Sequence, residues 1–81
     1  MQPAQCRAAR ALLDWTQSDL VNYSGVAQKT VADFERGLTK LHRRTLASIT
    51  AAFEAAGIEF IKGGARLRAT PKGRGRQSND E

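Results

Sequence analysis

The stretch from Thr16 to Gly37 constrains the fold of this chain more than any other part. Its apolar residues are spaced so that two short segments, separated by Gly25, each turn one stripe of side chains inward. Glycine readily adopts the positive φ that a tight turn after a helix requires. The stretch therefore predicts two short helices joined by a glycine turn. The inward residues are Leu20, Val26, Val31 and Phe34.

Length and composition limit the chain to one small domain. Its 81 residues, 41% of them hydrophobic, suffice for one compact core and are too few for two. The formal charge of +5 favours polyanionic partners such as nucleic acids. The single cysteine, Cys6, excludes an internal disulfide, and no residue spacing suits a metal, so no metal or other cofactor is expected.

The sequence also indicates where the protein works. No apolar run approaches the roughly 20 residues that span a bilayer. The amino terminus lacks the charged-then-apolar order of a secretory signal. We therefore expect a cytoplasmic, nucleoid-associated protein with no membrane partner.

Further helices are expected on either side of the glycine turn. Ala, Arg and Leu dominate residues 4–13 and favour a helix there. Thr16 is a suitable N-cap for the next helix, with Asp19 as its capping-box acid. Apolar periodicity predicts two more helices, over residues 28–36 and 45–56.

The carboxyl-terminal part differs in character. Residues 58–61 are rich in β-branched and aromatic side chains and Gly63-Gly64 is a turn signal, so a short hairpin or strand is predicted over 58–69. Residues 70–81 have no apolar anchor to offset ordering entropy, which predicts a disordered tail after a domain spanning 1–69. The fold class is therefore mainly all-α. Basic residues at this end, which either follow a DNA backbone or serve solubility, are Arg66, Arg68, Lys72, Arg74 and Arg76.

A set of residues spread over the first two thirds of the chain matches one known pattern. It comprises Thr16-Gln17, Leu20, Gly25-Val26, Val31, Phe34-Glu35-Arg36-Gly37, Thr45-Leu46 and Ile49. With these residues the chain resembles the Cro and lambda-repressor-like helix-turn-helix family, also called the xenobiotic-response-element type. The resemblance covers roughly residues 4–56 and implies a compact four-helix domain with the helix-turn-helix at 16–37.

The family pattern also bears on individual residues. It implies an ion pair inside the domain between Arg10 and Glu35, which orders the fold because either charge buried alone is costly. Ala27 departs from the pattern, which has Ser or Thr at this N-cap, and forfeits a cap worth roughly 1 kcal/mol. The family usually continues with a fifth helix, where this chain has the predicted hairpin.

The third predicted helix has the side chains to read double-stranded DNA. A helix fits the major groove and reads base edges through its first residues. Gln28 can pair with adenine and Lys29 with guanine, while Thr30 and Ala32 can touch a thymine methyl group. Asp33 either accepts from a cytosine amine or neutralises Lys29 one turn earlier, and we favour the ion pair. Phosphate contacts are predicted for Thr16, Gln17, Arg36, Lys40, Arg43 and Arg44.

The predicted function follows from this interface. One such domain reads few base pairs, so a homodimer on palindromic DNA is expected. Its interface is predicted at the end of the fourth helix together with Ile58, Phe60 and Ile61, and the hairpin either pairs with a second hairpin or covers its own core. The chain is then a sequence-specific transcriptional regulator, a repressor or self-regulating controller of bacterial, phage or mobile-element origin.

Other functions follow from different readings of the same residues. An alternative is a protein-interaction module of the same fold, antitoxin-like or antiactivator-like, that binds a partner protein. No nucleophile and base set is recognisable, so no enzymatic activity and no small-molecule substrate are expected. Regulation is then expected through concentration or through a regulatory protein partner.

Overall fold

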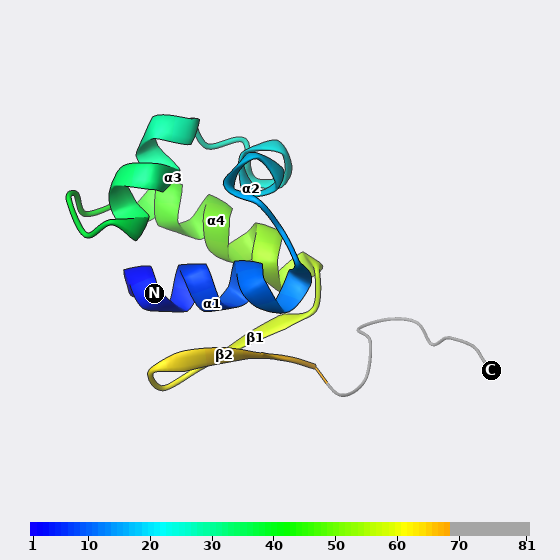
Figure 1. The fold of residues 1–81 in the computed structure, drawn as a ribbon. Coiled ribbons are helices and arrows are strands. Elements are labelled where there is room, and N and C mark those ends of the chain that lie inside the picture. The colour runs from blue at the N-terminus through cyan, green and yellow to red at the C-terminus, as the bar shows by residue number, and fades with distance from the viewer. Residues whose placement is uncertain (69–81) are drawn as a thin grey trace.

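A computed structural model describes residues 1–68, and in that range the chain forms four helices followed by one hairpin (Figure 1). The mainly helical fold class with a carboxyl-terminal hairpin is therefore confirmed. The predicted boundary at residue 69 and the predicted tail with Lys72, Arg74 and Arg76 lie outside the described residues. The elements are α1 (Pro3–Leu13), α2 (Gln17–Ser24), α3 (Gln28–Glu35), α4 (Arg43–Ala55), β1 (Ile58–Ile61) and β2 (Gly64–Leu67).

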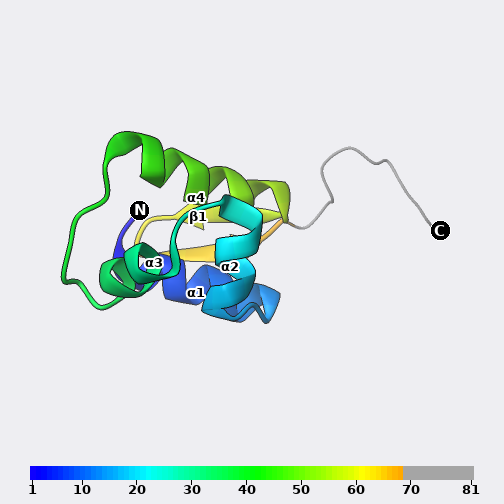
Figure 2. The same ribbon diagram turned by 90° about the horizontal axis from the view of Figure 1, so that it is seen from above.

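Helix α1 lies at the centre of the arrangement. Helices α2 and α3 lie on one side of it, the two strands lie on the other, and α4 runs behind (Figures 1 and 2). Helix α1 packs most extensively on β2, whereas α4 packs against both α2 and β1. No helix within residues 1–68 is long and apolar enough to cross a membrane.

The predicted helix ends near the glycine turn are confirmed. The Thr16 hydroxyl accepts from the Asp19 N–H at 3.0 Å, and the Asp19 carboxylate accepts from the Thr16 N–H at 2.9 Å. Gly25 ends α2 with φ of 75°. Asp14 ends α1 in the left-handed region, with φ of 58°, which is uncommon for any residue except glycine.

The start of α4 and the hairpin turn differ from the prediction, and the ends of α3 and α4 and the start of α1 each differ by one residue. Helix α4 begins at Arg43 rather than at residue 45, because His42 adopts the extended backbone of an N-cap and the polar residues after it form the first turn. The hairpin turn consists of residues 62 and 63, not of Gly63-Gly64. Gly64 is already part of β2 and pairs with Ile61. Local composition marks a turn but does not fix the register of the strands beside it.

One hydrophobic core is shared by all four helices and β1. A row of aromatic rings runs through it to the surface. The Trp15 ring stacks on Tyr23 with centroids 4.6 Å apart and on Phe53 at 5.6 Å. Phe53 in turn meets Phe60 edge-on at 5.9 Å. Trp15 and Phe53 therefore pack inside the domain. The buried hydrophobic residues are Cys6, Ala9, Leu20, Val31, Phe34, Ile49, Phe53 and Ile58.

The hairpin covers this core with one face. Ile58 has no exposed surface, so its prediction as a subunit-interface residue is wrong. A β-branched residue at the start of a short strand is as suited to the chain's own core as to a partner. Phe60 is half-buried against Phe53, and Ile61 is exposed.

The carboxylate of Glu35 joins α1, α2 and α3. Its Oε1 accepts from Arg10 Nη2 at 2.8 Å and from Gln17 Nε2 at 3.0 Å. Its Oε2 accepts from Arg10 Nε at 2.7 Å and from Cys6 Sγ at 3.0 Å. Glu35 is only 3% exposed. The predicted ion pair between Arg10 and Glu35 is confirmed, and it anchors the last residue of α3 to the two preceding helices.

This cluster shifts the pKa values of its members. Burial is the largest influence on Glu35 and acts to raise its pKa, but hydrogen bonds from Arg10, Cys6 and Gln17 together hold the pKa below its usual value. The hydrogen bond to Glu35 raises the pKa of the Arg10 guanidinium. Burial, reinforced by Glu35, raises the pKa of the Cys6 thiol, so this cysteine stays protonated at neutral pH.

Removing the charge of Glu35 tests its structural role. We expect Glu35→Gln to lower the free energy of unfolding by about 3 kcal/mol, because it leaves the half-buried guanidinium of Arg10 without its counter-ion. Denaturant unfolding followed by circular dichroism measures this change. Glu59→Gln is the control, since Glu59 pairs with Arg66 at 2.9 Å on an exposed face and should leave the midpoint unchanged. Equal effects of the two substitutions would contradict the assignment.

Acid should weaken the fold through the same group. Because folding lowers the pKa of Glu35, its contribution is fully present above the pKa of the unfolded chain, roughly 4.3. The contribution is lost as the pH falls through the lower pKa of the folded state. Urea midpoints measured as a function of pH should therefore fall more steeply below about pH 4.5 for the wild type than for Glu35→Gln. Parallel curves for the two proteins would show that another group titrates.

Candidate nucleic-acid interface

Helix α3 buries one side and exposes its amino-terminal end. Val31, Phe34 and Glu35 are buried, which fixes the rotation of the helix about its axis. Gln28 and Lys29 are exposed in the first turn. The other predicted base-reading residues, which are half-buried at the margin of this exposed face, are Thr30, Ala32 and Asp33.

The structure contains the ion pair that we favour for Asp33. Its carboxylate accepts from the Lys29 ammonium at 3.0 Å across one helical turn. The Lys29 side chain is 87% exposed and that of Asp33 is 23% exposed. Such a pair on a helix surface is worth only about 0.3–0.5 kcal/mol. Lys29 is therefore held in place weakly and can be redirected to a stronger acceptor.

The first turn of α2 contacts both the amino-terminal and the carboxyl-terminal end of α3. The Gln17 amide donates to Glu35, so this predicted phosphate contact turns its side chain inward instead. The Ser18 hydroxyl donates to Gln28 Oε1 at 3.4 Å. Sequence reasoning missed Ser18, because only the packing angle between the two helices brings it next to Gln28.

Helices α3 and α4 begin without side-chain caps. Ala27 and His42 hold the two N-cap positions, and neither side chain accepts a hydrogen bond from the first turn. Neither of these helices has an acidic residue in its first turn. The first backbone N–H groups, at the positive end of each helix dipole, therefore remain available to an anion.

The starts of these two helices lie next to each other. A groove of about 520 Å³ lies between them, with Lys29, Thr30 and Asp33 on the α3 side and Lys40, His42 and Thr45 on the other. Arg44 lines an adjoining hollow of about 320 Å³ together with Ala27, Thr30 and Ser48. The base-reading candidates and part of the predicted phosphate contacts are therefore neighbours.

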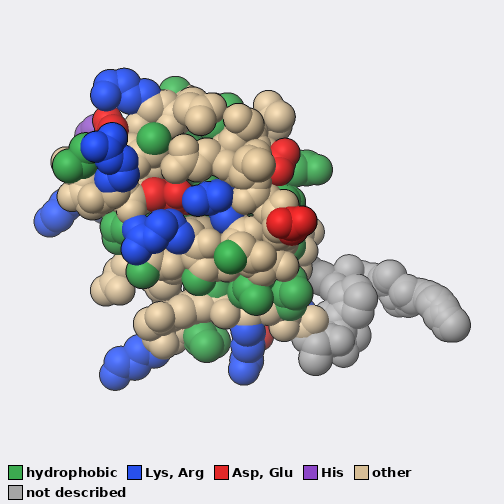
Figure 3. Space-filling view, in the orientation of Figure 1, with side chains coloured by type: hydrophobic (Ala, Val, Ile, Leu, Met, Phe, Trp, Pro, Cys, Tyr) green, Lys and Arg blue, Asp and Glu red, His purple; other side chains and the backbone are tan. Residues whose placement is uncertain are grey.

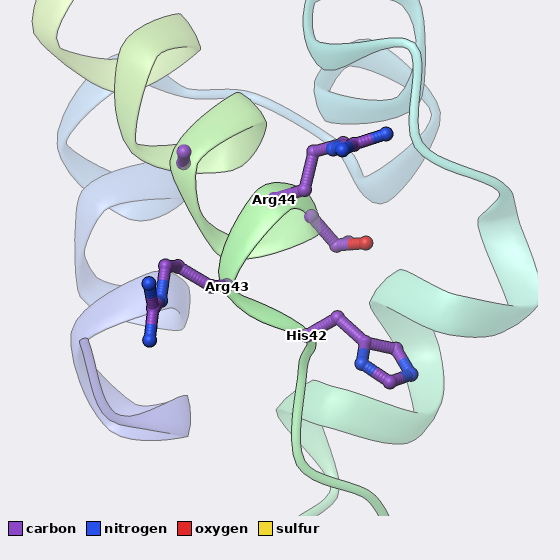
Figure 4. A pocket seen from close by; sticks show the side chains of 5 residues that line it. His42, Arg43 and Arg44 are labelled. Carbon is purple, nitrogen blue, oxygen red and sulfur yellow. The ribbon is translucent and has the colours of Figure 1, made fainter.

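The first turn of α4 divides its basic residues between two sides (Figure 4). His42 and Arg44 lie toward α3, whereas Arg43 projects to the opposite side of the helix. A shallow hollow of about 810 Å³ is lined by His42, Arg43, Arg44, Thr45 and Ala47. Arg36 is exposed at the other end of α3. Arg44 and Lys40 therefore flank the amino-terminal end of α3, and Arg43 does not.

The distribution of charge follows this geometry. Figure 3 shows most of the visible Lys and Arg side chains, in blue, on the side where α3 lies, and acidic groups, in red, both among them and at the opposite edge. Within residues 1–68 no group of three or more His, Cys, Asp and Glu side chains comes together as a metal site requires.

Comparison with known proteins adds nothing to this geometry. Neither a scan against protein-family models nor a search of curated proteins finds a match to this chain. The functional assignment therefore depends on the site itself.

The uncapped start of α3 leads to a prediction about stability. Ala27→Ser should raise the free energy of unfolding by roughly 1 kcal/mol, because the serine hydroxyl accepts from an N–H of the first turn. Ala47→Ser, at an exposed position inside α4, is the control and should lower it by a few tenths of a kcal/mol. Thermal unfolding measures both. A loss of stability for Ala27→Ser would mean that those N–H groups are not free.

Proposed function

We propose that this chain is a sequence-specific DNA-binding transcriptional regulator of the Cro and lambda-repressor-like type, a repressor or self-regulating controller that binds palindromic operator DNA as a homodimer. Helix α3 enters the major groove with its first turn toward the base edges. Gln28 reads adenine through its amide, and Lys29 reads guanine after releasing Asp33. The arrangement of α2 and α3 is that of a helix-turn-helix, in which the second helix reads and the first crosses the backbone.

One observation carries this proposal. The exposed amide and ammonium groups of Gln28 and Lys29 stand at the uncapped start of α3, beside the uncapped and basic start of α4. Long polar side chains suit base edges, and free N–H groups with nearby cations suit phosphates. Both kinds of group are required on the same face for a helix that lies in the major groove.

The phosphate contacts divide into two groups. Lys40 and Arg44 flank the groove between α3 and α4, where they can neutralise phosphates beside the reading helix. Gln17 contributes through its backbone N–H at the start of α2, since its side chain is bonded to Glu35, whereas the N–H and the hydroxyl of Thr16 are both bonded to Asp19. This division leaves the basic side chains as the main source of sequence-independent affinity.

One observation favours the alternative, a module that binds a partner protein. An apolar groove of about 600 Å³ lies beside the loop from α3 to α4, and Leu38 on its rim is 64% exposed. A hydrophobic anchor of a partner would fit such a groove. If Leu38→Glu abolishes regulation in cells and the wild-type chain binds no DNA in vitro, the protein-binding alternative gains and the DNA-binding proposal loses.

Selection of duplexes from a random-sequence pool, followed by affinity measurements, tests the DNA-binding proposal. We expect Gln28→Ala and Lys29→Ala to cost about 1–3 kcal/mol on the selected duplex and to relax the preference at one base each. Arg44→Ala should weaken all duplexes alike and reduce the slope of affinity against salt by about one.

Lys62→Ala is the matched control for the loss of a positive charge. Lys62 is exposed in the hairpin turn, on the other side of α1 from α3, and its removal should leave affinity almost unchanged (Figure 1). Equal losses for Arg44→Ala and Lys62→Ala, or failure to enrich any sequence, would contradict a specific interface at α3.

A further inference from the structure

The solvent-facing side of α1 is mostly apolar, and Arg7 is the one exposed charged residue of this helix. Ala4, Ala11 and Leu12 are exposed and Ala8 is half-buried, and their spacing places all of them on one face of the helix. An outer helix face that meets only water normally carries charged or polar side chains. Leu12 is 41% exposed. This face therefore has the composition of a packed surface without a packed neighbour among residues 1–68.

The polar residues of α1 are directed elsewhere. The Gln5 amide donates to the carbonyls of Ile61 and Gly64 at 2.9 and 3.2 Å. Arg10 donates to the Glu35 carboxylate and Arg7 to the Glu35 carbonyl. Each of these side chains is bound to the hairpin or to α3, so none covers the outer face of α1.

The open edge of β2 adjoins this face. The Arg68 N–H donates to the Gly57 carbonyl at 2.8 Å, so these two residues form a hydrogen-bonded pair. Along an antiparallel ladder such pairs alternate with pairs that are not hydrogen-bonded to each other. The backbone N–H and C=O groups of Ala65 and Leu67 therefore point away from β1. Within residues 1–68, β2 pairs with β1 alone. Leu67 is 48% exposed, and Figure 3 shows apolar surface in green across α1 and the adjoining hairpin.

We propose that a second copy of this chain docks here about a two-fold axis, with β2 pairing with β2 and α1 lying against α1, both antiparallel. The surface, called the α1–β2 face, comprises Ala4, Ala8, Ala11, Leu12, Ala65 and Leu67. It identifies the interface of the homodimer in the proposed function, and it replaces the interface predicted from Ile58, Phe60 and Ile61.

The hydrogen-bonding groups of the edge fit an identical strand. In a register centred on Arg66, Ala65 of each copy lies opposite Leu67 of the other, so both outward peptide groups of each strand gain partners. Paired strands lie about 4.8 Å apart, and packed helices lie about 8–10 Å apart. Helix α1 runs along β2 (Figure 1), and its small alanines allow that helix separation.

Charge also favours docking of a second copy on this face over docking on any other part of the surface. Two chains of charge +5 repel each other through most of their surfaces, whereas the six residues of the α1–β2 face carry no charge and are bordered by the exposed Arg7 and Arg66. The antiparallel arrangement places the exposed Asp14, at the carboxyl end of α1, near the amino-terminal end of the partner's α1, whose first turn has no acidic residue. Arg66 meets its symmetry mate, but each is already neutralised by its own Glu59 at 2.9 Å.

The mass of the full chain in solution, measured by sedimentation equilibrium at micromolar concentrations without DNA, tests this interface. The wild type should have the mass of a dimer, and Leu12→Glu and Leu67→Glu should each halve that mass. Leu38→Glu is the matched control, because Leu38 is more exposed but lies in the loop before α4, and it should leave the dimer intact.

Two further variants separate docking from folding. Ala4→Glu places an acid in the first turn of α1, where the helix dipole favours it, so it should give a monomer with undiminished helical circular dichroism. Ala65→Pro removes one outward N–H of the strand edge and should also give a monomer.

A wild-type chain that stays monomeric would overturn the interface, and so would a dimer that only Leu38→Glu dissociates. Because these measurements use no DNA, their failure is distinguishable from failure of the reading helix.

Discussion

The fold depends on the carboxylate of Glu35. Helices α2 and α3 have eight residues each, and isolated helices of that length are unstable in water. Their geometry must therefore come from tertiary contacts, and Glu35 supplies one to each neighbour: Arg10 and Cys6 in α1 and Gln17 in α2. A buried ion pair is a weak source of net stability. Its main effect here is to select one angle between α2 and α3, and hence one position for Gln28.

The two ends of α3 are consequently unlike each other. The carboxyl-terminal end is held by a buried side chain, whereas the amino-terminal end has no cap at Ala27 and presents free N–H groups beside Lys29. A serine at this N-cap would satisfy one of those groups within the chain. The absence of a cap thus lowers stability and keeps the helix end receptive to an anion, a compromise that is common at binding sites.

Features that depend on local signals could be predicted from the sequence, and features that depend on tertiary geometry could not. Thr16, Asp19 and Gly25 define caps and a turn within a few residues, so the two short helices joined by a glycine turn were predictable. The pair of Arg10 and Glu35 came from family resemblance, not from spacing. The inward turn of Gln17 and the contact of Ser18 depend on how two helices cross. The burial of Ile58 depends on which element covers β1, and the alternation of side chains along a strand does not reveal that element.

The hairpin shows how such a small domain can prepare a surface for association. Two four-residue strands are marginal in isolation, yet here both ends are tied to helices. Gln5 binds the carbonyls on either side of the turn, and the Arg68 guanidinium donates to the Glu54 carbonyl at 3.1 Å. Among the described residues 1–68, the middle of the β2 edge is left unpaired. Since the strand is already ordered within the monomer, pairing with a second strand loses little further entropy, which favours association through an otherwise small interface.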